Sequence, residues 1–113
     1  MKFLPLLRAA RKRRHRTRLI FIGLPTVELA LEQIQSRVSQ GGHDVPESKV
    51  RDRWGRAHDN LVTFMHVVDD VLIFSNVATT PIAVAERVGR LRLRIVDELA
   101  LPDVLRRLLP VHR

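Results

Sequence analysis

The chain has 113 residues, of which 45% are hydrophobic and none is cysteine. This length fits one domain or part of a larger one, and the lack of cysteine excludes a disulfide framework and a thiolate metal site. The net charge is +8, and residues 1–18 hold eight Lys or Arg and no acid, so the remaining residues are neutral with 12 charges of each sign. The basic arm at 8–18 therefore predicts weak, nonspecific binding to nucleic acid.

No stretch approaches the roughly 20 apolar residues of a membrane span, and the N-terminal residues lack the order of a signal peptide. We therefore predict a cytoplasmic protein without a membrane partner. The first predicted element is a helix at about 4–14, because Phe3, Leu6, Leu7 and Ala10 have helical spacing.

Two continuous apolar runs predict strands that are buried on both faces, as in a parallel sheet. The first is TRLIFIGLP and the second is VLIFSN. Between them, Thr26 can cap one helix that ends at Gly41 and Gly42, and Pro46 begins a second, longer helix. After the second strand we expect a short helix from Pro81 to about Arg87, an edge strand in RLRLRIV and a terminal helix in PDVLRRLL.

Strands that alternate with helices predict an α/β fold, a parallel sheet flanked by helices. Only two strands are apolar enough for the centre of such a sheet, so we expect part of a larger sheet. Exposed strand edges and apolar surfaces then predict that the isolated chain is loosely folded or self-associates.

Arginines near the Gly-Gly turn form the first candidate site. Arg37 closes the helix before the turn, and Arg51 and Arg53 begin the helix after it. Their guanidinium groups could converge on one phosphate, since each can donate two parallel hydrogen bonds. The alternative is a solvated helix surface with acidic neighbours such as Glu47.

Other polar residues each have two interpretations. Asp44 can cap the second helix, whereas His43 could act as a general base, although no nucleophile is close in sequence. The histidines lack metal-ligand spacing. Asp69 and Asp70 could bind magnesium, but a role in the turn is favoured. Asn76 follows the second strand at the edge where parallel sheets bind ligands, and is a candidate nucleotide contact.

The segment LIFIGLPTVELALEQIQSRVSQGGHDVPESKVRDRWGRAHDNL resembles the second half of zeta-toxin-like P-loop kinases. The likeness extends from about Phe3 to Leu109, and the block Gly-Gly-His-Asp-Val-Pro is its most specific part. It implies one portion, residues 1–113, of an ATP- and Mg²⁺-dependent phosphotransferase. A lid-like loop and helix at 40–56, with Gly41, Gly42, His43 and Asp44 in the loop, would lie near the phosphates, which Arg37, Arg51 and Arg53 would contact.

The resemblance also implies a phosphate-binding motif, Gly-x-x-x-x-Gly-Lys-Ser/Thr, which the 113 residues do not contain. We therefore expect a partial P-loop kinase-like sheet without its N-terminal Walker A half, no catalytic residue, and no ATP turnover by the chain alone. The implied partners are a missing N-terminal half or an antitoxin. The alternative function is a small basic protein that binds nucleic acid through the arm at 8–18.

Overall fold

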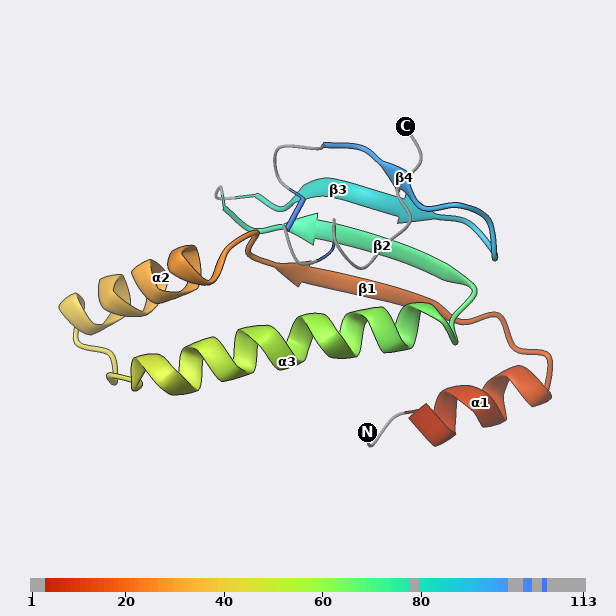
Figure 1. The fold of residues 1–113 in the computed structure, drawn as a ribbon, viewed down its shortest axis with the longest axis horizontal. Coiled ribbons are helices and arrows are strands. Elements are labelled where there is room, and N and C mark those ends of the chain that lie inside the picture. Colours follow the sequence, from red (N-terminus) through yellow and green to blue (C-terminus); the bar gives the residue numbers. More distant parts are fainter. Residues whose placement is uncertain (1–3, 78–79, 98–100, 103–104, 106–113) are drawn as a thin grey trace.

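The computed structural model describes residues 4–77, 80–97, 101, 102 and 105. Three helices and four strands follow one another in the order α1 (Leu4–Lys12), β1 (Arg18–Gly23), α2 (Val27–Ser39), α3 (Glu47–Met65), β2 (Asp70–Ser75), β3 (Ile82–Arg87) and β4 (Arg94–Ile95). The strands form one sheet in the order β1-β2-β3-β4. Figure 1 shows α3 running along this sheet, with α2 near one end of α3 and α1 near the other.

The first two strands form the parallel pair that the sequence predicts. Arg18 of β1 pairs with Asp70 of β2, and Gly23 pairs with Ser75. Parallel strands require a crossover connection, and α2 and α3 together supply it. The carboxyl ends of β1 and β2 consequently meet at one edge of the sheet, on the left in Figure 1, where α2 begins.

The rest of the sheet is antiparallel, so the sheet is mixed and the expectation of a parallel sheet is only partly correct. The helix expected after Pro81 is wrong, because residues Ile82–Arg87 form β3. The β-branched residues Ile82 and Val84 favour a strand, and pairing with β2 overrides the helix start that a proline signals. A register shift leaves Val84 as an extra residue in β3, and its carbonyl accepts hydrogen bonds from the Val96 and Asp97 amides (2.7 and 3.1 Å).

The hydrophobic core lies between α3 and one face of the sheet. Leu61 and Met65 of α3 pack there with Val71 and Ile73 of β2 and with Leu105. Side chains alternate between the two faces of a strand, and in β1 the set that points away from α3 is exposed.

The apolar composition of β1 predicts that both of its faces are buried. This prediction is wrong, because one face of the strand is exposed. Ile20 and Ile22 are 56% and 54% exposed. The strand also lies at the edge of the described sheet, with β2 as its only pairing neighbour there.

The helix boundaries follow recognisable end signals. The Thr26 hydroxyl accepts a hydrogen bond from the Leu29 amide (3.2 Å), which confirms the expected cap of α2. Gly41 ends this helix at a positive φ of 94°. The cap expected from Asp44 is wrong, because Pro46 is the N-cap of α3 and no side chain caps it.

Two further expectations concern the C-terminal part and the membrane. The strand expected in RLRLRIV shrinks to the two residues of β4. The terminal helix expected in PDVLRRLL falls mostly outside the described residues. Within the described ranges, no helix combines the length and the apolar content that crossing a bilayer requires.

Candidate functional site

A cleft lies at the carboxyl ends of the two parallel strands. Its volume is about 280 Å³, at the lower end of the roughly 300–1,000 Å³ of small-molecule sites. The strand ends, α2 and α3 all contribute to its wall, through Phe21, Ile22, Gly23, Leu24, Gln33, Trp54, Ala57, His58 and Asn76. This is the edge of an open α/β sheet at which ligands commonly bind.

His58 is the buried polar residue of this cleft. It follows Trp54 by four residues on α3, so both side chains lie on the same face of the helix. Only 1% of His58 is exposed. The centroid of its ring lies 4.0 Å from the ring centroid of Trp54 and 5.2 Å from that of Phe21. The His58 and Phe21 rings meet edge to face. The imidazole is thus held between two aromatic rings.

The hydrogen bonds of His58 determine which nitrogen carries the proton. Nδ1 lies 2.8 Å from the carbonyl oxygen of Trp54, which can only accept, so Nδ1–H is the donor. Burial lowers the pKa of His58, although the bond to Trp54 and the charge of Asp59 act in the opposite direction. Nε2 of the neutral ring is therefore an acceptor, and this buried atom has no partner within the described part of the chain.

The loop after β1 completes the cleft. The Trp54 indole N–H donates to the carbonyl of Leu24 (3.1 Å), which fixes α3 against this loop. A Cβ at Gly23 would lie 2.6 Å from the ring of Phe21, so the glycine leaves room for that ring beside His58. The backbone amide of Asn76 donates a hydrogen bond to the Gly23 carbonyl (2.9 Å), which joins the two strand ends.

The side chain of Asn76 lies at this cleft and is exposed, at the strand edge where the sequence predicts a ligand contact. Its role in binding stays a prediction. Gln33 adds a second amide from α2. Amide side chains can both donate and accept, so the cleft combines two adaptable amides with one buried acceptor.

The three arginines expected to hold phosphate do not line the cleft. Arg51 donates two hydrogen bonds to Glu47 (3.1 and 2.8 Å) and lies 3.9 Å from Glu28. Arg53 is exposed two positions further along α3, and residues two apart on a helix do not face each other. Arg37 is exposed in the last turn of α2. These guanidinium groups therefore do not share one helix face.

The lid-like loop has a clear structural role at its glycines. The Gly42 amide donates to the Arg37 carbonyl (2.7 Å), and a Cβ at Gly42 would lie 2.8 Å from that same oxygen. Together with the positive φ of Gly41, this geometry ends α2. His43 and Asp44 follow with exposed side chains.

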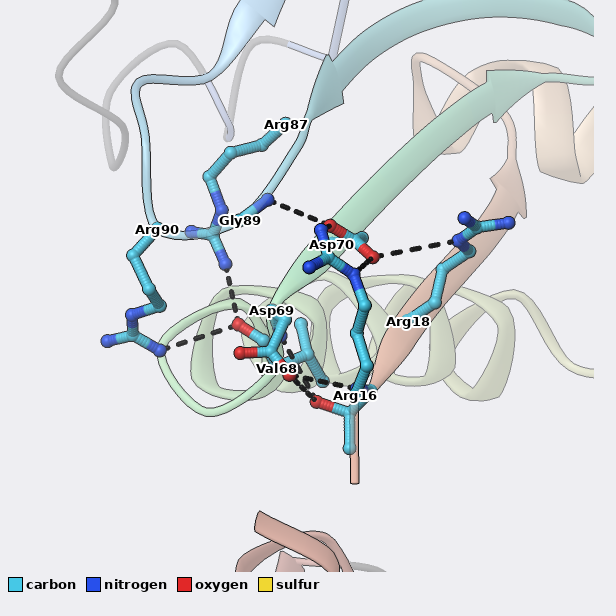
Figure 2. A network of polar contacts seen from close by, with 9 residues as sticks. Arg16, Arg18, Val68, Asp69, Asp70, Arg87, Gly89 and Arg90 are labelled. Atoms are coloured by element: carbon cyan, nitrogen blue, oxygen red, sulfur yellow. Dashed lines mark hydrogen bonds and ion pairs between the residues drawn. The ribbon is translucent and has the colours of Figure 1, made fainter. Parts of the chain in front are cut away.

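Asp70 belongs to a polar network at the opposite end of the parallel strands, shown in Figure 2. Arg16 donates two hydrogen bonds to its carboxylate (2.7 and 2.6 Å), the Gly89 amide donates a third (2.8 Å), and Arg18 lies at 3.9 Å. The bond to Arg16, followed by that to Gly89, lowers the pKa of Asp70 to about 2. Asp70 thus joins three segments of the chain.

Asp69 has a similar structural role. Its carboxylate accepts hydrogen bonds from the backbone amide and the hydroxyl of Thr17 (2.9 and 3.2 Å). The hydrogen bond from the backbone amide is the largest cause of the lowered pKa of Asp69. Both aspartates therefore serve the turn before β2, which is the interpretation that the sequence favours.

Arginines also stabilise the C-terminal end of α3. The carbonyls of residues 65–68 accept hydrogen bonds at 2.7–3.0 Å from Arg11, Arg87 and Arg90. Cations at this end of a helix compensate the carbonyls that have no partner within the helix and the negative end of the helix dipole.

Comparison with known protein families, curated proteins and solved structures finds no match to this chain. The likeness to zeta-toxin-like kinases therefore rests on the sequence motifs alone. His58 was not singled out from the sequence, but its place between Trp54 and Leu61 in the apolar stripe of α3 is a signal that could have identified it.

Proposed function

We propose that the chain is a nucleotide-binding module whose cleft takes the base of the nucleotide. The observation that carries the proposal is the unpaired Nε2 of the buried, neutral His58. A buried acceptor without a partner is unfavourable, and a ligand N–H group that reaches it would remove that penalty. Nucleobases present such groups on a flat aromatic ring.

The surroundings of His58 support a heteroaromatic ligand. Trp54 offers an aromatic surface on which a base can stack. The amides of Gln33 and Asn76 can donate to ring nitrogens and accept from amino groups. The small cleft volume favours the base alone over a complete dinucleotide.

The resemblance to zeta-toxin-like kinases points to an adenine nucleotide and to a phosphotransferase ancestry. The described residues do not fit a magnesium site, because Asp69 and Asp70 are occupied by Thr17 and Arg16 at the other end of the strands. Phosphates would also find Arg51 already bonded to Glu47. We therefore expect the base, rather than the phosphates, to supply the affinity.

Trp54 provides a direct assay because it is the only tryptophan of the chain. Adenosine, AMP and ATP should change its fluorescence with similar affinities. His58→Phe removes the acceptor and keeps a ring, so it should weaken adenosine binding about tenfold. His66→Phe, at the exposed C-cap of α3, is the matched control and should bind normally.

Two results would contradict the proposal. One is a folded chain whose fluorescence does not respond to any nucleoside at millimolar concentration. The other is unchanged adenosine affinity in His58→Phe. Binding of ATP but not of adenosine would instead support a phosphate clamp and the lid interpretation of the loop.

A further inference from the structure

The end of the molecule opposite the cleft brings together basic residues that are far apart in sequence. Figure 1 shows α1, the start of β1 and the turn between β3 and β4 at this end. Segments 8–18, 69–70 and 86–94 contain 11 cations and three carboxylates. The cations are Arg8, Arg11, Lys12, Arg13, Arg14, Arg16, Arg18, Arg87, Arg90, Arg92 and Arg94. We call these 11 residues the basic end.

Some cations of the basic end hold the fold together. Arg16 binds Asp70, Arg94 binds Glu86, and Arg87 donates to backbone carbonyls. A guanidinium that donates to a carbonyl keeps its full charge, so Arg11, Arg87 and Arg90 still contribute to the local potential.

Other cations of the basic end are free to bind a ligand. They are exposed, and their side chains make no hydrogen bond or ion pair with any residue that the structure describes. Four of them lie on or just after α1 and one lies before β4, namely Arg8, Lys12, Arg13, Arg14 and Arg92. A ligand that spans both segments can thus meet unpaired charge from two directions.

We propose that the basic end is a composite binding surface for double-stranded nucleic acid, formed by the arm at 8–18 and the β3–β4 turn. The phosphate backbone carries one negative charge per about 1.7 Å of duplex, and cations from separate segments can follow it. Proteins that bind single strands combine a basic groove with aromatic side chains on which the bases stack, and neither segment contains Phe, Trp or Tyr. Charge without aromatic residues therefore favours a duplex.

The orientation of α1 favours nucleic acid over a membrane surface. Leu4, Leu7 and Ala10 are partly buried, and Leu7 packs against the hydrophobic core. The helix therefore turns its apolar side inward and its charged side to solvent. An interfacial membrane helix has the opposite requirement, because its apolar face must enter the lipid. Leu6 on α1 is exposed, and Val88 and Leu91 are exposed in the β3–β4 turn. The two turn residues do not extend the apolar side of α1, because that side packs inward.

The test measures the anisotropy of a labelled DNA duplex of about 20 base pairs over a range of KCl concentrations. Removing one phosphate contact should reduce the slope of log K against log salt by about 1. Arg92→Gln should have this effect and weaken binding several-fold at low salt. Lys12→Gln with Arg13→Gln should reduce the slope further. Arg56→Gln, which removes an exposed charge of α3 without a partner among the described residues, is the matched control and should leave the slope unchanged.

The comparison of the arm and the turn decides the proposal. Wild-type affinity in Arg92→Gln, with a loss in the arm variant, would overturn the composite surface. Tighter binding to single strands, or to vesicles containing phosphatidylserine, would overturn the choice of a duplex. These measurements do not involve the cleft, so a failure of adenosine binding leaves them intact. Circular dichroism should show that all variants remain folded, since none of these side chains has a partner among the described residues.

Discussion

Replacing His58 with Phe should stabilise the protein while it removes the proposed ligand contact. The unpaired Nε2 of a 99%-buried ring costs about 1–3 kcal/mol of folding free energy, and the bond from Nδ1 to Trp54 returns about 0.5–1.5 kcal/mol. The Trp54 carbonyl remains within an α-helix and keeps its helical partner. The variant should therefore gain about 1 kcal/mol, or roughly 4 °C in Tm.

Acidification should widen the difference in unfolding free energy between the wild type and His58→Phe. The native pKa of His58 is lowered by burial, whereas the unfolded chain has a pKa of about 6.5. As pH falls below that value, the unfolded state takes up a proton that the native ring resists, so the wild type loses stability. The variant lacks this linkage, and the other histidines are common to both proteins.

Urea denaturation provides the assay, followed by circular dichroism and by Trp54 fluorescence. Unfolding free energies at about pH 7.5 and about pH 5 give the difference between the two proteins at each pH. A variant that is less stable at neutral pH would mean that Nε2 is satisfied in solution. A difference that narrows in acid would mean that His58 is protonated in the native state. Either result would refute the reasoning on which the nucleotide cleft rests.

Further predictions concern the glycines, the core, the network around Asp70 and the sheet edge. Gly55→Ala, within α3 and with no atom near the added Cβ, should raise the unfolding free energy by about 0.5–1 kcal/mol, whereas Gly41→Ala, at a φ of 94°, should lower it by about 1–2 kcal/mol; urea curves that rank them otherwise would contradict this. Leu61→Ala, in the core, should cost about 2–5 kcal/mol in the same assay. Asp70 has a native pKa of about 2 against about 3.9 when unfolded, so its carboxylate should stabilise the protein above about pH 4 and lose this contribution between about pH 4 and 2. Asp70→Asn should remove this loss from the plot of unfolding free energy against pH, and an unchanged plot would exclude a stabilising role of the carboxylate. Ile22→Lys should reduce self-association in light scattering, and equal scattering from both proteins would show that the edge of β1 is not responsible.

The sequence predicted the elements whose periodicity is strong and local. The stripes of α2 and α3 and the apolar runs of β1 and β2 lie where the pattern indicates. The pattern failed at β3, because the proline before Ile82 signals a helix start, whereas pairing with β2 makes the segment a strand. It also could not show that β1 lies at the sheet edge, because apolar composition is the same whether or not a neighbour covers it.

The candidate site was predictable only in part. The edge rule for parallel strands gave the position of Asn76, because that rule depends on topology rather than on distance. The place of His58 in the apolar stripe of α3 indicates that it is buried, but the sequence cannot show that Nε2 lacks a partner, because that depends on how β1 and α3 pack together. The arginines were expected to converge, but Glu47 neutralises Arg51 within the same helix.

The edge of β1 that has no neighbour among the described strands gives this strand an alternating pattern of hydrogen exchange. The Gly23 carbonyl accepts from the amide that follows β2, so odd-numbered residues of β1 bond to β2 while the amides of Arg18, Ile20 and Ile22 point away from it. Those outward amides should exchange with deuterium at rates close to those of an unfolded chain, however stable the domain is. Any strand that adds to this edge, from any source, would slow every second amide of β1 and leave the intervening ones unchanged. The exchange rates of alternate amides in β1 therefore report whether another strand pairs with this edge in the cell.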